Sequence, residues 1–243
     1  INLANHNFKL FIDDKPFNLN VRGNFTWGKE KICSYKIREN MINNLEWEKN
    51  GFLVVKNILS FNQFCYLKES TKNTLIKIIE DLGIQVDKKK FNLENYHKFI
   101  KSDREHQAII VKSSKLTIND FDFDLEIITR YLSQLMNVKL TSWIEKLGRS
   151  HIQVRINRPQ SLDINPPHRD SYIDAYKDVI NVWLPVAGCN KETSLPVVPE
   201  SHFIKENNIL KTSLNGATIN ENNYNVPCIS KTSKGYLRMI RPN

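Results

Sequence analysis

The pattern of apolar residues changes near Trp143, and this change most constrains what the chain can fold into. Before Trp143, apolar residues recur with helical spacing; after it, short apolar segments alternate with clusters of Pro, Gly and Asn. Helical spacing places apolar side chains on one face of a helix, whereas short segments between turn formers are typical of antiparallel sandwiches and barrels. We therefore expect one α+β domain, with a hairpin and supporting helices over 1–148 and a β core over 149–243.

Several elements can be expected in the first part from their boundary residues. Ser60 is a favourable helix N-cap, and Gly83 is a favourable stop for a stripe of apolar residues that starts at Phe61. Residues 84–118 carry no clear pattern. The expected elements are a strand at 8–12 that opens a hairpin through the turn at 13–16, a short helix at 45–50 ended by Gly51, a buried strand at 52–55, a helix at 61–82 and a helix at 120–136.

The second part is expected to consist of strands and one long loop. Alternating side chains predict a strand at 151–157, and an apolar run predicts another at 179–186. Seven Asn residues between 205 and 225 favour a long polar loop, which could serve as a lid or simply lie on the surface.

The positive charge of the chain is a weak guide to its partners. The formal net charge is +9, but the chain has 25 Lys against only 10 Arg, and the longest basic run is Lys88-Lys89-Lys90. Scattered lysines without a recognisable binding motif do not favour a nucleic-acid partner. No apolar run reaches the roughly 18–20 residues needed to span a bilayer, and four widely spaced Cys fit free thiols in a reducing compartment. We expect a cytoplasmic protein without a nucleic-acid or membrane partner.

The most distinctive short motif is His168-Arg169-Asp170, which follows Pro166-Pro167. On an extended segment, residues two apart share a face, so the imidazole and the carboxylate can hold one metal ion from one side. A neutral imidazole with a carboxylate is two thirds of the two-His-one-carboxylate triad of non-heme Fe(II) oxygenases. Alone, such a tripeptide is a weak signal.

The predicted strand at 151–157 has a polar face that carries His151, Gln153, Arg155 and Asn157. Amide, guanidinium and imidazole groups suit the lining of a polar cavity. An ordinary strand with one solvated face is the alternative, and both remain open at this point.

The order of these segments resembles the phytanoyl-CoA dioxygenase family of Fe(II)/2-oxoglutarate oxygenases. The matching segments are the "GF-hydrophobic" stretch 48–59, the "Q-x-R-I-N-x-P" stretch 153–159, the H-x-D of His168 and Asp170, the Trp-containing run 179–186, and the "S-L-x-V-x-P-G-S-H" stretch 194–202, in which Glu200 replaces Gly. The resemblance covers about two thirds of the chain, from Leu45 to His202.

The resemblance implies a double-stranded β-helix core, a cupin-like jelly-roll, with the N-terminal helices packed on one sheet. It implies Fe(II) held by His168 and Asp170, with 2-oxoglutarate and O₂ as cosubstrates. Gln153, Arg155, Asn181 and Trp183 match positions near the cosubstrate, although core packing is the stronger alternative for Trp183. Asn157 and Tyr172 are candidates for the substrate pocket; Tyr172, two residues after Asp170, would point the same way as the ligands.

The sequence departs from the family pattern at the second His ligand. That ligand is expected on a strand beyond His202, and no histidine follows His202. Three explanations remain: the chain is a portion of a longer protein, the third ligand is His202 or His151, or the metal has been lost. We favour the first, because the chain lacks an initiator Met and ends within an expected strand. The β core is accordingly expected to be incomplete at its C-terminal end.

These observations together predict an Fe(II)/2-oxoglutarate-dependent dioxygenase, a hydroxylase of a small hydrophilic organic substrate, as a monomer or a homodimer. The alternative is a non-catalytic β-barrel protein that binds a small molecule or a glycan and has lost the metal site. His6, His97 and His106 lie in polar stretches and are expected to be solvated.

Overall fold

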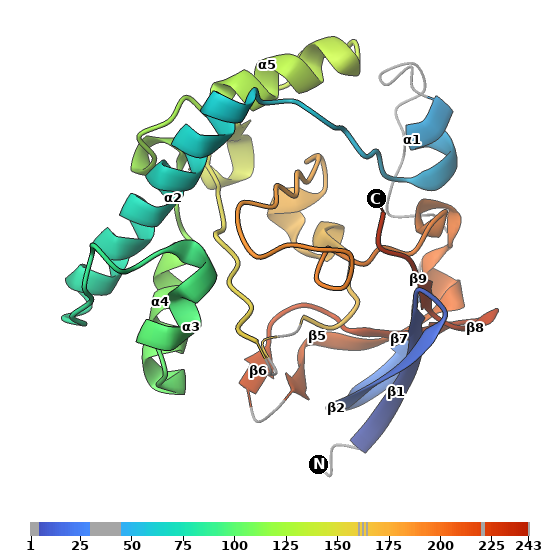
Figure 1. The fold of residues 1–243 in the computed structure, drawn as a ribbon. Helices are drawn as coiled ribbons and strands as arrows, with labels where there is room; N and C mark the ends of the chain where they lie inside the picture. Colours follow the sequence, from blue (N-terminus) through green and yellow to red (C-terminus); the bar gives the residue numbers. More distant parts are fainter. Residues whose placement is uncertain are drawn as a thin grey trace. The chain divides into compact units, whose positions relative to one another are not determined.

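The chain forms two compact units in a computed structural model that describes residues 5–29, 45–159, 161, 163, 165–219 and 222–242. The first unit comprises Ile1–Val54, Asn165–Trp183 and Lys191–Asn243, and the second comprises Val55–Ile164 and Leu184–Asn190. Most strands belong to the first unit and most helices to the second (Figure 1). The predicted division at 148–149 into helices and β core remains a prediction, because this grouping of the chain does not test it.

The first unit opens with the expected hairpin. Strand β1 (Asn5–Ile12) pairs antiparallel with the long strand β2 (Lys15–Trp27). Asp13 and Asp14 connect them, with φ of 49° and 61°. A two-residue turn with positive φ at both positions matches the right-handed twist of the flanking strands, and Asp tolerates this region better than most residues do. The hairpin predicted at the start of the chain is confirmed.

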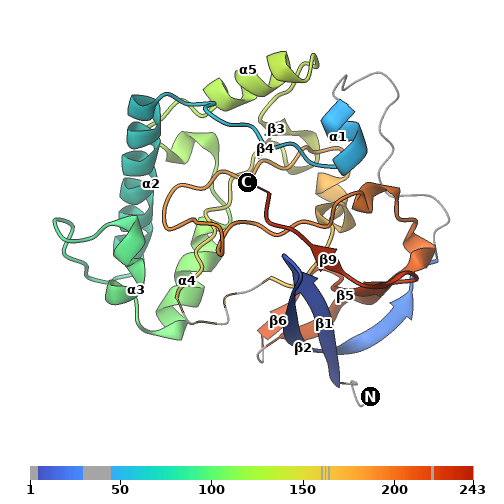
Figure 2. The same cartoon turned by 45° about the vertical axis from the view of Figure 1, so that its right-hand side comes forward.

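The other strands of the first unit extend this hairpin into one sheet of mainly antiparallel strands (Figure 2). The strand order is β8-β7-β5-β2-β1-β9, with β6 paired to β5, and only β1 and β9 run parallel. The bounds are β5 (Ile209–Ile219), β6 (Asn222–Tyr224), β7 (Ile229–Thr232), β8 (Gly235–Tyr236) and β9 (Arg238–Met239). The fold is thus mixed α and β, as predicted, but the sheet is not closed and a jelly-roll is not found in the described residues.

The core of the first unit follows from alternation along the strands. Phe8 and Leu10 of β1 are 1% and 2% exposed, whereas Lys9 between them is exposed. Successive side chains on a strand point to opposite faces, so one face of the sheet is apolar and buried. The buried residues around Phe8 are Leu19, Val21, Ala217, Ile219 and Cys228, and those around Leu10 are Ile209, Ile229 and Leu237.

The long polar loop predicted over 205–225 is wrong. Residues 206–208 form a short 3₁₀ turn, η7 (Glu206–Asn208), and β5 and β6 follow it. Ile209, Ala217 and Ile219 are buried on the sheet, although Asn residues surround them in the sequence. Asn disfavours strands only weakly, and burial of the apolar positions against a neighbouring strand overrides that preference.

Helix α1 (Leu45–Asn50) also lies in the first unit and ends at Gly51, as predicted. Gly51 has φ of +77°, the left-handed conformation that glycine adopts at little cost. A Cβ at this position would lie 2.3 Å from Nδ1 of His202, whose Nε2 hydrogen-bonds the carbonyl oxygen of Glu48. His202 therefore packs against the end of α1.

We expect Gly51→Ala to lower the free energy of unfolding by about 1–3 kcal/mol, because it combines backbone strain with a steric clash. Gly83→Ala is the matched control: Gly83 has φ of +76°, but a Cβ at this position would have no atom within 4 Å. Urea denaturation of both variants measures the difference. Equal losses of stability would contradict a tight contact between Gly51 and His202.

The second unit is built on helix α2 (Phe61–Asp81), which confirms the predicted helix. Ser60 and Gln63 form a reciprocal capping box, and the helix ends just before Gly83. The buried side chains of the predicted stripe include Leu67, Leu75, Ile78 and Ile79. Phe61, the first residue of the helix, was also part of the predicted stripe but is 80% exposed.

Short helices complete this unit, including some in the stretch without a sequence pattern. They are η1 (Leu93–Asn95), α3 (Tyr96–Phe99), α4 (Asp103–Ser113), η2 (Ile118–Asp120), α5 (Glu126–Leu135) and η3 (Glu145–Leu147). The strands β3 (Trp143–Ile144) and β4 (Arg149–Ser150) form a separate pair. Helix α4 packs on α2 (Figure 1). Helix α5 is shorter than the predicted 120–136 because Asp120 caps η2 instead.

The strands predicted at 52–55, 151–157 and 179–186 are wrong. These segments are neither helix nor strand, and none forms a ladder with another described segment; Ile152 makes one isolated bridge, to Leu116. The predicted alternation at 151–157 nevertheless holds. Ile152, Val154 and Ile156 pack against the apolar core of the second unit, and the polar residues between them are exposed.

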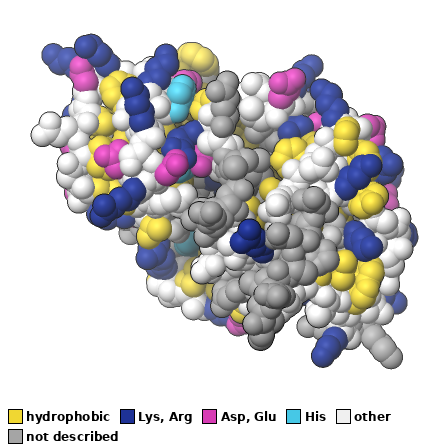
Figure 3. All heavy atoms as spheres, turned by 90° about the horizontal axis from the view of Figure 1, so that it is seen from below, with side chains coloured by type: hydrophobic (Ala, Val, Ile, Leu, Met, Phe, Trp, Pro, Cys, Tyr) yellow, Lys and Arg dark blue, Asp and Glu magenta, His cyan; other side chains and the backbone are white. Residues whose placement is uncertain are grey.

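The charged side chains that can be seen on one face of the molecule are dispersed (Figure 3). On the face drawn in Figure 3, Lys and Arg side chains lie scattered among acidic ones rather than in one basic patch. Of the described cysteines, Cys65 and Cys189 are exposed free thiols, and burial raises the pKa of the Cys228 thiol to about 12. None of the helices in the described ranges is long and apolar enough to cross a membrane.

Candidate functional site

His168 and Asp170 meet in the first unit. Nε2 of His168 lies 3.2 Å from Oδ1 of Asp170, and the two side chains are 20% and 44% exposed. Arg169 between them has φ −110° and ψ 131°, an extended conformation. Extended backbone directs the side chains on either side of Arg169 to the same face, which is the arrangement that their spacing predicts.

The backbone around this pair is fixed on both sides. Pro166 and Pro167 cannot donate backbone hydrogen bonds and restrict the approach to His168. The carbonyl oxygen of Pro167 accepts a 2.7 Å hydrogen bond from the Ile229 amide of β7. After Arg169 the chain turns into the 3₁₀ helix η4 (Asp170–Tyr172). The pair therefore lies between a strand contact and a tight turn.

Each of the two side chains has a partner on its other side. Nδ1 of His168 lies 2.7 Å from the carbonyl oxygen of Pro166, which can only accept, so Nδ1 is the donor in this hydrogen bond. Oδ2 of Asp170 accepts a hydrogen bond from the Asn181 side-chain amide. Tyr224 of β6 stacks edge-on to the His168 ring at 5.9 Å. Nε2 of His168 and Oδ1 of Asp170 are the atoms through which the two side chains face one another.

This donor pair fits a small divalent metal ion. Metal–nitrogen and metal–oxygen bonds of about 2.1 Å at right angles would place the two donor atoms about 3.0 Å apart; the observed separation is 3.2 Å. Metal-binding histidines usually donate their other ring N–H to a carbonyl or carboxylate oxygen, as Nδ1 of His168 does to Pro166. No cluster of three or more potential His, Cys, Asp or Glu ligands occurs among the residues that the structure describes.

The other residues predicted for the site divide between the two units. Asn181 touches the pair directly, and Trp183 in the same unit is 43% exposed. The Tyr172 hydroxyl donates a hydrogen bond to the buried carboxylate of Glu206. Tyr172 lies in the 3₁₀ helix η4, which is not extended, so the alternation of side chains that would direct it to the same side as His168 and Asp170 does not continue beyond Asp170. Gln153, Arg155 and Asn157 are exposed on the extended segment of the second unit.

Two neighbours of the pair were not expected from the sequence, Pro166 through its carbonyl oxygen and Tyr224, nor was Glu206, which binds the intervening Arg169. Pro166 is adjacent in the sequence and could have been considered as a hydrogen-bond acceptor. Tyr224 and Glu206 lie in the stretch predicted to be a polar loop, so only the pairing of β5 and β6 with the sheet reveals their positions.

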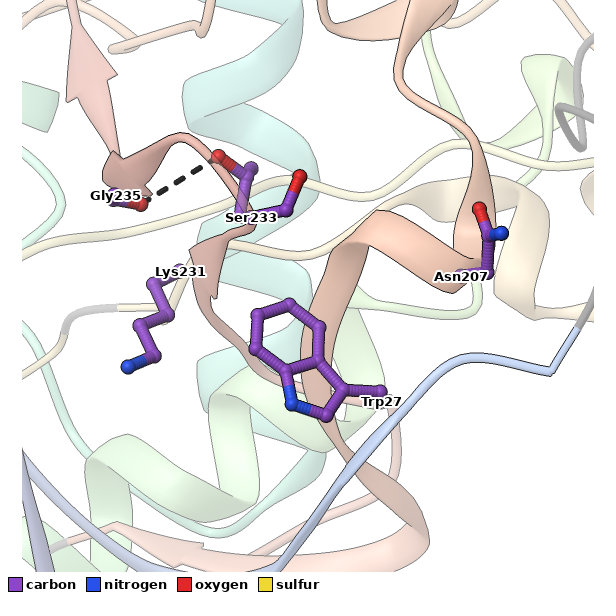
Figure 4. A pocket seen from close by; sticks show the side chains of 6 residues that line it. Trp27, Asn207, Lys231, Ser233 and Gly235 are labelled. Carbon is purple, nitrogen blue, oxygen red and sulfur yellow. Dashed lines mark hydrogen bonds between the residues drawn. The ribbon is translucent and has the colours of Figure 1, made fainter.

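A surface hollow of about 430 Å³ lies elsewhere in the first unit. Figure 4 shows the Trp27 indole at its centre, with Lys231, Ser233 and Asn207 around it. Trp27 is 44% exposed. The hollow contains none of the predicted site residues and no acid–base pair, so it adds no chemistry to the pair at 168 and 170.

A second polar cluster lies inside the helical unit. His106 is 1% exposed, which corrects the expectation of a solvated histidine. Its Nδ1 lies 3.0 Å from the Tyr96 hydroxyl, and its Nε2 lies 3.3 Å from Oδ2 of Asp163. Burial lowers the pKa of His106, an effect only partly opposed by the Asp163 carboxylate. His106 and Tyr96, at 1% and 3% exposed, thus form a buried polar contact within this unit.

Comparisons with protein-family models, with curated proteins and with solved structures found no match to this chain.

Proposed function

We propose that the protein is an Fe(II)- and 2-oxoglutarate-dependent dioxygenase that hydroxylates a small, hydrophilic organic molecule. The observation that carries the proposal is the facing pair of donor atoms, Nε2 of His168 and Oδ1 of Asp170, at 3.2 Å. An imidazole and a carboxylate on one side of an ion are typical of non-heme Fe(II) oxygenases. The resemblance of the motif order to the phytanoyl-CoA dioxygenase family supports the same assignment.

Under this proposal His168 and Asp170 would hold the iron, and their neighbours would orient them. The Pro166 carbonyl oxygen would keep the His168 proton on Nδ1, so that Nε2 presents its lone pair. Asn181 would orient the Asp170 carboxylate by binding Oδ2, while Oδ1 faces Nε2 of His168. When bound, iron with 2-oxoglutarate supplies the oxidation of an unactivated C–H bond by O₂.

Thermal denaturation of the full-length protein under anaerobic conditions tests this proposal. We expect Mn(II) together with 2-oxoglutarate to raise the Tm by roughly 5–10 °C at a hundredfold excess over the dissociation constant, since such binding contributes about 2.7 kcal/mol. His168→Ala and Asp170→Ala should abolish the shift. Asp174→Ala is the matched control, because Asp174 is an acidic residue of the next turn that pairs with Lys177 at the surface.

The absence of any shift in the wild-type full-length protein would contradict the proposal and favour the non-catalytic binding protein. An unchanged shift in both alanine variants would place the metal elsewhere in the molecule.

A further inference from the structure

Glu206 is a fully buried carboxylate beside the His168–Asp170 segment. Glu206 is the first residue of the short turn η7 in the first unit, and its side chain is 0% exposed. Oε1 accepts from Nη1 of Arg169 at 2.5 Å, and Oε2 accepts from Nζ of Lys211 at 2.6 Å. The Tyr172 hydroxyl lies 3.2 Å from both oxygens. The Glu206 carboxylate thus contacts two cationic side chains, Arg169 and Lys211, and one phenol hydroxyl.

Stability alone is a poor reason for such an arrangement. Desolvating a carboxylate and its cationic partners is costly, and apolar side chains of similar volume often replace buried ion pairs without loss. A buried, fully hydrogen-bonded charge instead fixes one particular geometry, because its partners have few alternative positions.

The partners of Glu206 lie on both sides of Asp170. Arg169 is the residue between the two proposed ligands, and Tyr172 follows Asp170 by two positions within η4. The other amino group of Arg169, Nη2, donates to the carbonyl oxygens of Ser201 and Ile204, at 2.6 and 2.9 Å. The side chains of Arg169 and Tyr172 are therefore anchored at one point, so the backbone that carries Asp170 has little freedom to rotate.

Glu206 is itself held in place by the backbone directly after β2 and by the side chain of Lys211. A Cβ on Gly28 would lie 2.2 Å from the backbone oxygen of Glu206, so the two backbones are in direct contact there. Lys211 of β5 holds the second carboxylate oxygen, and its ammonium lies 3.9 Å above the Tyr172 ring. Glu206 is thus fixed to the sheet, and the segment 168–172 is fixed to Glu206.

We propose that Glu206 is the positioning residue of the His168–Asp170 pair: through Arg169 and Tyr172 it sets the separation of Nε2 and Oδ1 before an ion binds. This inference rests on the proposed function for its consequence, metal affinity, but not for the anchoring itself. Loss of a residue that orients metal ligands typically weakens metal binding about 10–100-fold.

The test compares Glu206→Gln with Lys211→Met in the full-length protein. Glutamine keeps the shape of Glu206 but removes its charge; Lys211→Met removes the other cation and leaves the Glu206–Arg169 contact. Mn(II) affinity is measured by electron paramagnetic resonance, and amide hydrogen exchange is measured for the peptide that contains Tyr172 and Ile173, whose amides bond the carbonyl oxygens of Arg169 and Asp170. We expect Glu206→Gln to weaken Mn(II) binding about 10–100-fold and to accelerate exchange. Lys211→Met should have a smaller effect on both, because Arg169 still binds Glu206.

Tyr172→Phe separates positioning from the simple loss of a negative charge, because it changes no charge and removes only the hydroxyl that bonds Glu206. It should weaken Mn(II) binding less than Glu206→Gln does. The double variant should bind no more weakly than Glu206→Gln alone, since both changes act through one carboxylate.

Mn(II) affinity within twofold of wild type in Glu206→Gln, or equal weakening in Lys211→Met, would overturn the inference. If the wild-type protein binds no Mn(II), the proposed function fails, and hydrogen exchange then decides the anchoring: unchanged exchange in Glu206→Gln overturns it, and faster exchange supports it.

Discussion

Asp163→Asn is expected to destabilise the helical unit by about 3 kcal/mol, a large effect for a single carboxylate. Asp163 is 11% exposed and accepts hydrogen bonds from the backbone amide, Nε and Nη2 of Arg158, at 3.0, 2.9 and 3.1 Å. The same carboxylate faces Nε2 of His106 at 3.3 Å. An asparagine would leave the guanidinium, itself 12% exposed, without its buried counter-charge.

The matched control for this prediction acts on the same guanidinium. Asp103 also binds Nη2 of Arg158, at 2.8 Å, but its side chain is 88% exposed. Ion pairs at the surface contribute less than about 1 kcal/mol, because water screens them. Asp103→Asn should therefore have a small effect in urea denaturation, and equal losses in the two variants would show that burial does not govern the strength of the pair.

Local signals in the sequence predicted the elements that short-range interactions determine. Ser60 and Gln63 cap α2, and Asp13 and Asp14 form the hairpin turn, because each of these features depends on residues no more than three positions apart. The His168–Asp170 pair belongs to the same class: extended backbone at Arg169 is sufficient to bring Nε2 and Oδ1 together.

Features that depend on distant partners could not be predicted in this way. The apolar run at 179–186 has the composition of a strand but has no neighbouring strand among the described segments, whereas the Asn-rich stretch from 209 onward becomes β5 because β2 and β7 lie on either side of it. Glu206 is informative only after folding, since its partner Arg169 is 37 positions away. Alternation along 151–157 predicted which side chains are buried, but not that the segment lacks a ladder.

Acidification is the second perturbation for which we expect a large effect, and it acts on the same cluster as Asp163→Asn. Burial lowers the pKa of His106 below its ordinary value of 6.5; Asp163 and Asp103 oppose this shift, and Arg158 adds to it. The folded state therefore binds fewer protons than the unfolded state just below pH 6.5, so the contribution of His106 to stability is complete above pH 6.5 and declines as the pH falls. Burial would raise the pKa of Asp163, but hydrogen bonds from Arg158 and Ser161 outweigh it and hold the pKa at about 2.

These shifts predict a loss of stability in two stages. The first stage, below pH 6.5, comes from His106 together with His151, whose pKa burial also lowers. The second, from about pH 4 towards pH 2, removes about 1–2 kcal/mol as Asp163 becomes protonated. Urea denaturation at pH 8 and pH 5, followed by hydrogen exchange of the α4 peptide, isolates the first stage. His106→Gln should reduce the difference between these two pH values without removing it, because His151 still titrates. If the unfolding free energy of His106→Gln differs between pH 8 and pH 5 by as much as that of wild type, His106 is excluded as a source of the pH dependence.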